Sequence, residues 1–194
     1  MLPGTLQVAL KEWAVVQRAL LDGHQIVLLR KGGLVEESGD FDLRAREFLL
    51  YPTYEHETER KGDIQPCFGQ WLQEEERRKP APSAVRIEAA CEVADVIRAQ
   101  DAESLIRLMP QHIWSEQFVR NRFDWEPYKP VFLLLVRAYR LPNPIELPIR
   151  PEYGGCRSWI TLSEPVPAAG AAPAIASEEG FRRRIELTAS LLQT

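Results

Sequence analysis

Cysteine is scarce in this sequence, and its spacing excludes two common classes of small protein. There are three cysteines, an odd number, and no Cys-x-x-Cys motif occurs. Disulfide frameworks and structural zinc sites are built from paired, regularly spaced cysteines. Cys67, Cys91 and Cys156 are therefore not expected to form either one.

Long apolar runs are also missing. The longest extends from Val131 to Val136, far short of the roughly 20 residues that a transmembrane helix requires. The stretch from Met1 to Gly4 carries neither a basic segment nor a small-residue cleavage site of the kind found in signal peptides. We therefore expect a cytoplasmic protein that has no membrane partner.

The familiar signatures of catalysis are absent too. No Walker motif, nucleophile elbow, dinucleotide fingerprint or ordered Ser/His/Asp set occurs. A metal-dependent nuclease with two carboxylates and a lysine would need Glu-x-Lys, and Glu47-Phe48-Leu49 lacks that lysine. No enzyme class and no cofactor is indicated by these patterns.

What is present is the composition of a packed globular domain. Of 194 residues, 45% are hydrophobic and 27% charged, and the formal net charge is −4. This balance argues against a nucleic-acid interface over the whole surface but allows a local basic patch. Residues 34–76 carry 12 acidic and 4 basic side chains, whereas residues 120–160 carry 7 basic and 4 acidic. If these stretches lie on different faces, one side is acidic and the other mildly basic.

Apolar periodicity predicts an α+β fold, with a curved, mostly antiparallel sheet or incomplete barrel flanked by helices. Residues 53–82 are expected to form a long loop with one turn of helix near Trp71, unless a whole helix has been missed. We expect a domain over 1–162, a Pro/Ala-rich linker over 163–177, and a helix over 178–194 docked on the domain. Strands are predicted at 25–30, 47–52, 85–97, 131–140 and 156–162, and helices at 6–21, 101–109 and 113–123.

The predicted elements also imply where particular side chains and strand ends lie. Helical spacing over 6–21 turns Glu12 and Gln17 toward solvent. Pro52 is expected to place the end of its strand at a sheet edge, and the prolines of 141–144 are expected to end the strand before them. A helix competes with the strand over 85–97, since several of its residues are alanine.

The first candidate site is Arg30-Lys31-Gly32-Gly33, where two cations precede a flexible turn at a strand end. Backbone N–H groups of such a turn can approach an anion closely, which suits phosphate or a nucleobase edge. The alternative is a solvated turn with two surface charges.

The second candidate is His56, which lies between Glu55 and Glu57 just beyond the next strand. A neighbouring carboxylate orients an imidazole for general-base work, and His56 with Glu55 or Glu57 could ligate a divalent metal. The alternative is an exposed charged loop. Both candidates depend on the first two strands lying side by side, so that their ends share one hollow.

The third candidate combines aromatic and basic side chains around Arg122, Trp125 and Lys129. Aromatic rings stack on bases, and cations hold phosphates. The alternative places the nearby Trp114 in the core and leaves the arginines as surface charges. Trp114, Arg120 and Tyr128 complete the group.

Four short segments resemble an uncharacterised bacterial family catalogued as domain of unknown function 1802, which occurs largely in photosynthetic bacteria. The segments are Ala9–Ala14, Leu28–Gly33, Phe48–Thr53 and Tyr153–Trp159. The resemblance implies a family but neither an activity nor catalytic residues.

A more distant similarity is to ASCH domains, a PUA-like group of small β-barrels that bind RNA or modified nucleosides. Their motif is Gly-x-Lys-x-x-Glu-x-Arg, and Gly23 and Arg30 stand at the matching separation. Gln25 stands at the lysine position of this motif and Leu28 at the glutamate position.

These observations favour a module that binds RNA, DNA or a nucleotide through Arg30, Lys31, Arg122, Trp125 and Lys129. A small hydrolase acting on nucleotides or nucleic acid with His56, with or without metal, is the first alternative. A domain that binds an unidentified protein partner is the second.

Overall fold

The computed structural model describes residues 2–31, 43–54, 61–155 and 157–193. Within them the chain forms one seven-stranded sheet with strand order β2-β5-β4-β3-β1-β6, and β7 pairs with β5. Only β1 and β3 run parallel. The strands are β1 (Thr5–Trp13), β2 (Val27–Lys31), β3 (Glu47–Thr53), β4 (Ala84–Ala99), β5 (Val131–Pro148), β6 (Trp159–Pro167) and β7 (Ala172–Pro173).

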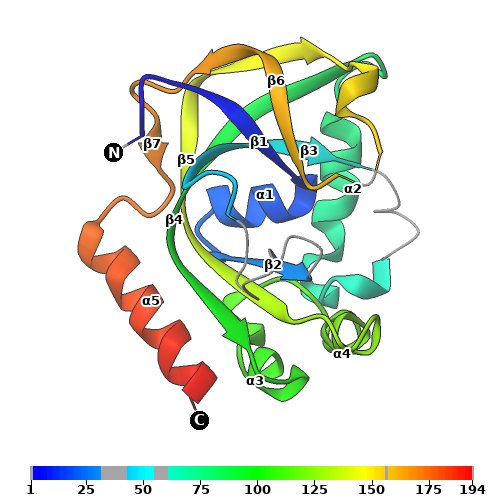
Figure 1. Cartoon of the computed structure of the whole chain (residues 1–194), viewed down its shortest axis with the longest axis vertical. Helices are drawn as coiled ribbons and strands as arrows, with labels where there is room; N and C mark the ends of the chain where they lie inside the picture. The colour runs from blue at the N-terminus through cyan, green and yellow to red at the C-terminus, as the bar shows by residue number, and fades with distance from the viewer. Residues whose placement is uncertain (1, 32–42, 55–60, 156, 194) are drawn as a thin grey trace.

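Helices flank this open sheet, which confirms the predicted α+β class. They are α1 (Ala14–Leu21), α2 (Gly69–Arg78), α3 (Ala102–Arg107), α4 (Glu116–Asp124) and α5 (Glu178–Gln193). Figure 1 shows the sheet curving around α1, with α3 and α4 at one end and α5 along the outside. Every helix of the described residues is too short or too polar to span a membrane.

The curvature arises in the two longest strands. The ladder between β4 and β5 shifts register twice, between Ile87 and Ala89 and between Val93 and Asp95. Such bulges bend a strand and increase its twist. The sheet therefore curls, so that strands that are far apart in the strand order can face each other.

Alternation along the central strands divides the core between the two faces of the sheet. Leu10 and Leu50 belong to the larger cluster, with α1 and α4, whereas Ala9 and Leu49 belong to the smaller cluster on the opposite face. Successive side chains of a strand point to opposite faces, so a strand inside the sheet is buried on both.

The predicted helix over 6–21 is wrong in its first half, which forms β1. β1 lies between β3 and β6 and is covered on both faces, so its apolar positions do not alternate cleanly. The same residues therefore match helical spacing. Glu12 in β1 and Gln17 in α1 are both buried, so the prediction that they face solvent is wrong.

The prediction for 53–82 missed most of α2, which contains Trp71 and is anchored by the buried Leu72. β3 as a whole lies between β4 and β1, but its end at Pro52 pairs with β1 alone, as predicted for a strand end at a sheet edge. The ladder from β3 to β4 ends at Leu49, so the missing N–H of Pro52 breaks no bond to β4.

The prediction that 141–144 end the strand is also wrong, since β5 resumes pairing with β4 from Ile145 to Pro148. The strands predicted at 25–30 and 85–97 are confirmed as β2 and β4. Asp101 caps α3, as predicted, by accepting from the Ser104 amide.

The range 163–177, predicted as a linker, holds the end of β6 and all of β7. α5 packs the buried Phe181 against the larger core cluster, and Arg184 donates to the carbonyl oxygens of Gly23 and His24. The division of the chain into domain, linker and helix stays a prediction.

Candidate functional site

A cavity of about 160 Å³ opens where the ends of β1, β2 and β3 meet α4. We call it the β2–α4 cavity. It is lined by Lys11, Glu12, Trp13, Leu29, Arg30, Thr53, Trp114, Phe118 and Arg122. Arg30 and Arg122, taken from two separate sequence candidates, thus meet in one hollow.

Helix α4 supplies one wall. It begins after Ser115, whose hydroxyl accepts from the Phe118 amide at 3.1 Å. Phe118 and Arg122 are four residues apart and therefore share the face that looks into the cavity. The guanidinium carbon of Arg122 lies 5.6 Å from the centre of the Phe118 ring.

Arg30 forms an ion pair with Glu12 that spans the cavity floor. The guanidinium Nη2 lies 2.8 Å from Glu12 Oε2 and also donates to the Lys11 carbonyl at 3.2 Å. The two side chains are only 11% and 10% exposed. The buried Nε of Arg30 has no hydrogen-bond partner among the described residues.

The first two predicted strands, β2 and β3, are not neighbours, because β5 and β4 lie between them. The expectation that they lie side by side is wrong. Arg30 and Thr53 nevertheless line the same cavity, since the curled sheet brings the two strand ends together.

The residues that follow these strand ends lie outside the described residues. They are Gly32 and Gly33 of the first candidate and Glu55, His56 and Glu57 of the second. Within the described ranges, no three His, Cys, Asp or Glu side chains are grouped as metal ligands would be. Catalysis by His56 and metal binding stay predictions.

Lys31 lies next to the cavity, and its amine is engaged by the protein itself. Its Nζ donates to the carbonyl oxygens of Arg122 and Phe123, at 2.5 and 3.0 Å, near the end of α4. Burial lowers the pKa of Lys31, and the nearby Arg122 lowers it further. Lys31 thus holds α4 in place, and its contact with phosphate stays a prediction.

The inner walls of the cavity are aromatic. The rings of Trp13 and Phe118 are 5.9 Å apart, and those of Trp114 and Phe118 are stacked at 6.0 Å. Trp114 is buried, which agrees with the core alternative for that residue. Sequence reasoning missed Glu12 and Trp13, because both lie on a segment that was predicted to be a helix.

The segment after α4 forms a rim with two exposed aromatic rings. Trp125 is 57% exposed and Tyr128 is 76% exposed. Lys129 pairs with Glu126 at 2.8 Å, and Tyr128 donates to the same carboxylate. These hydrogen bonds, from Lys129 first, lower the pKa of Glu126.

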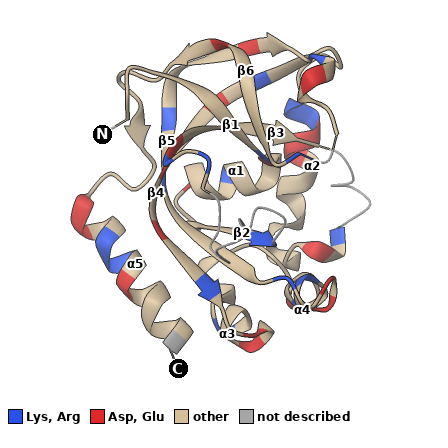
Figure 2. Cartoon of the chain, in the orientation of Figure 1, with Lys and Arg blue, Asp and Glu red and all other residues tan. Residues whose placement is uncertain are grey.

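Charge within the cavity is predominantly positive, since the guanidinium groups of Arg30 and Arg122 outnumber the single carboxylate of Glu12 among its lining residues, whereas the Lys11 amine is bonded to the Gly155 carbonyl. Elsewhere Figure 2 shows cations and anions side by side on α2, α4 and α5. The predicted division into an acidic and a basic face stays a prediction, since seven of the twelve acidic residues of 34–76 lie outside the described residues.

The cavity combines cations with flat apolar walls, which suits an anionic or planar ligand. Ligand pockets usually measure about 300–1,000 Å³. A space of about 160 Å³ therefore matches one phosphate or one ring system, with the remainder of a larger ligand lying over the rim.

A family model described as Domain of unknown function (DUF1802) matches residues 9–186. No curated protein gives a significant match. Among solved structures, a mutant of the ASCH protein from Zymomonas mobilis is 15% identical, covers 96% of this chain and 99% of its own, and has a TM-score of 0.46. The unmutated ASCH structure from the same organism is 15% identical, with coverages of 93% and 94% and a TM-score of 0.44.

Proposed function

Since the chain belongs to the family described as Domain of unknown function (DUF1802), a description that states no activity, we propose a function from the site itself. The protein is a nucleic-acid or nucleotide-binding module, and the β2–α4 cavity with its rim is the binding site. The observation that carries the proposal is the convergence of Arg30 and Arg122 on a cavity walled by Trp13 and Phe118.

Each side chain has a part that follows from its place. Arg122 faces the cavity from α4 and contacts phosphate or a base edge. Arg30 is held by Glu12 and adds its positive charge to the cavity. Trp125, on the exposed rim, stacks on a neighbouring base, and Lys129 belongs to the same segment after α4.

The test measures binding of a short fluorescent single-stranded RNA, and of its DNA counterpart, by anisotropy. Arg122→Ala is expected to weaken binding about tenfold, because one phosphate or base contact is lost. Its matched control is Arg182→Ala, an equal charge loss on the exposed face of α5, which leaves affinity unchanged.

Arg122→Lys separates a charge effect from a loss of folding, since it keeps the cation and is expected to retain most of the affinity. Wild-type protein that binds neither nucleic acid contradicts the proposal. Equal losses in Arg122→Ala and Arg182→Ala contradict the assignment of the site.

The alternative enzyme is separated from this proposal by a different readout. If His56 is catalytic, incubation with the same RNA yields shortened products, and His56→Ala prevents this. Binding without cleavage, unchanged by His56→Ala, supports a binding module.

A further inference from the structure

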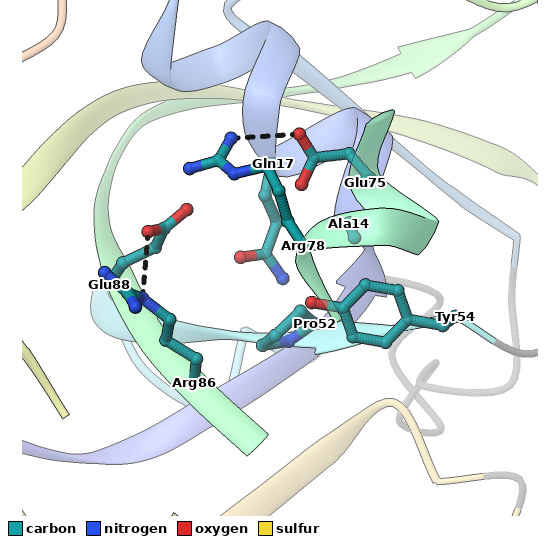
Figure 3. A pocket seen from close by; sticks show the side chains of 8 residues that line it. All are labelled: Ala14, Gln17, Pro52, Tyr54, Glu75, Arg78, Arg86 and Glu88. Atoms are coloured by element: carbon teal, nitrogen blue, oxygen red, sulfur yellow. Dashed lines mark hydrogen bonds and ion pairs between the residues drawn. The ribbon is translucent and has the colours of Figure 1, made fainter. Parts of the chain in front are cut away.

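A second cavity, of about 180 Å³, lies between α1, α2, β3 and β4 and has its own set of lining residues. We call it the α1–α2 cavity. Figure 3 shows the side chains that surround it. They are Ala14, Gln17, Pro52, Tyr54, Glu75, Arg78, Arg86 and Glu88.

This cavity holds two carboxylates and two guanidinium groups, so its formal charge is zero. Glu75 pairs with Arg78 at 3.1 Å, and Glu88 pairs with Arg86 at 3.6 Å. Figure 3 shows the two pairs on different sides of the space. A ligand therefore meets an anion and a cation on each side.

Glu75 is the most buried charged group of the set, with a side chain only 7% exposed. Burial raises its pKa, and the Glu88 carboxylate adds to this, whereas Arg78 and Arg18 act in the opposite direction. The two arginines offset only part of the effect of burial on the pKa of Glu75. A bound cation would therefore stabilise the charged form of this carboxylate.

Gln17 reaches the middle of the cavity from α1 (Figure 3). It is 3% exposed, and its Nε2 donates to the Glu12 carbonyl at 3.3 Å. Its carboxamide oxygen has no hydrogen-bond partner among the described residues. A buried acceptor aimed into the space is thus available to an N–H donor of a ligand.

The opposite wall is apolar. Pro52 and Tyr54 present their rings to the cavity from the end of β3 and the residue beyond it, and Ala14 adds a methyl group. This wall suits a small aliphatic side chain. The volume is below that of typical nucleotide or drug pockets, so the ligand is small.

We propose that the α1–α2 cavity binds a small zwitterion, a free aliphatic α-amino acid. Its ammonium is held by Glu75 and the Gln17 carboxamide oxygen, and its carboxylate by Arg78 or Arg86. A simple anion would face two carboxylates and a simple cation two guanidinium groups, whereas a zwitterion supplies a partner for both signs. The site is independent of the nucleic-acid site proposed above.

Isothermal titration calorimetry on the full chain tests this with glycine, L-alanine, L-valine and L-leucine. The N-acetyl derivative of each removes the ammonium, and the amide of each removes the carboxylate. At least one free amino acid is expected to bind, and both of its derivatives are expected to bind more weakly by on the order of thirtyfold. Binding of a derivative as tight as that of its parent overturns the proposal, as does no binding at millimolar concentration.

Two neighbouring carboxylates on α2 provide a matched pair of variants. Glu75→Gln removes the partner of the ammonium while keeping the shape of the side chain, and is expected to weaken binding on the order of thirtyfold. Glu76→Gln removes an exposed carboxylate that pairs with Lys79, and is expected to leave binding unchanged. Equal behaviour of the two variants overturns the assignment.

Arg86→Gln provides a second variant from β4, should Glu75→Gln fail to fold. It removes one cation that faces the carboxylate, and is expected to weaken amino-acid binding. All three variants leave the affinity for RNA unchanged, because none lines the β2–α4 cavity. Failure of this proposal is thus distinguishable from failure of the proposed function.

Discussion

The two cavities differ in how their charges are balanced. In the β2–α4 cavity two guanidinium groups stand against one carboxylate, and the Arg30–Glu12 pair is almost fully buried. In the α1–α2 cavity two ion pairs balance, and the arginine of each pair is about half exposed. The excess of positive charge suits phosphate, whereas the balanced set suits a ligand with both signs of charge.

The two kinds of ion pair also differ in what the loss of one member costs the fold. A buried ion pair cannot lose one member without leaving an uncompensated charge in the interior. An exposed pair can, because water replaces the missing partner. The following four predictions test this difference, in order of decreasing effect.

Arg30→Met is expected to lower the free energy of unfolding by about 3–5 kcal/mol, because Glu12 is left buried without its partner. Arg86→Met, in the other cavity, is expected to change it by less than about 0.5 kcal/mol. Urea denaturation followed by fluorescence measures both. The double variant Glu12→Gln/Arg30→Met should recover part of the loss, and equal effects of the two single variants would remove the distinction.

Acid is expected to destabilise the protein through His112, whose ring lies 5.3 Å from Trp114 in the cavity wall. Burial lowers the pKa of His112 from 6.5 to about 4, so below pH 6.5 the unfolded chain binds the proton that the folded chain does not. Stability therefore falls between pH 6.5 and 4, by about 3 kcal/mol from this group. Urea denaturation across this range should show a smaller fall in His112→Gln, and identical profiles would contradict the assignment.

Lys31→Met is expected to lower the free energy of unfolding by about 2 kcal/mol. The substitution removes two hydrogen bonds that a charged amine donates to carbonyl oxygens near the end of α4. Lys79→Met, which removes an exposed lysine paired with Glu76, serves as the control and should have little effect. If both variants melt at the wild-type temperature, Lys31 does not hold α4.

Trp125→Ala is expected to reduce the affinity for single-stranded RNA by about 1 kcal/mol through lost stacking. Because the ring is more than half exposed, the melting temperature should stay unchanged. Anisotropy and thermal denaturation on the same sample check both statements. An unchanged affinity would confine the site to the cavity and exclude the rim.

Local sequence patterns predicted an element correctly where one type of secondary structure fitted the pattern best. The apolar runs of β2 and β5, the long alternation of β4 and the Asp101 cap each predict the element that forms. The curved, mostly antiparallel sheet follows from these elements.

Local sequence patterns could not predict which strands pair with β1. Its edges pair with β3 and β6, which are distant in sequence. Its two faces are covered by the two core clusters, and this double burial erases the alternation that marks a half-buried strand. Glu12 and Trp13 were missed for this reason. The sequence predicted Arg30 and Arg122 as candidates, but the sheet curvature that joins them arises from two bulges that carry no clear sequence signal.

The central claim is that the β2–α4 cavity contacts the phosphate backbone of a nucleic acid. The most direct test is the slope of log affinity against log salt concentration for single-stranded RNA, in wild type and in Arg122→Ala. We predict a negative slope for wild type and a slope shallower by about 0.7 for the variant, because one phosphate contact is lost. A salt-independent affinity, or identical slopes for the two proteins, would contradict the account.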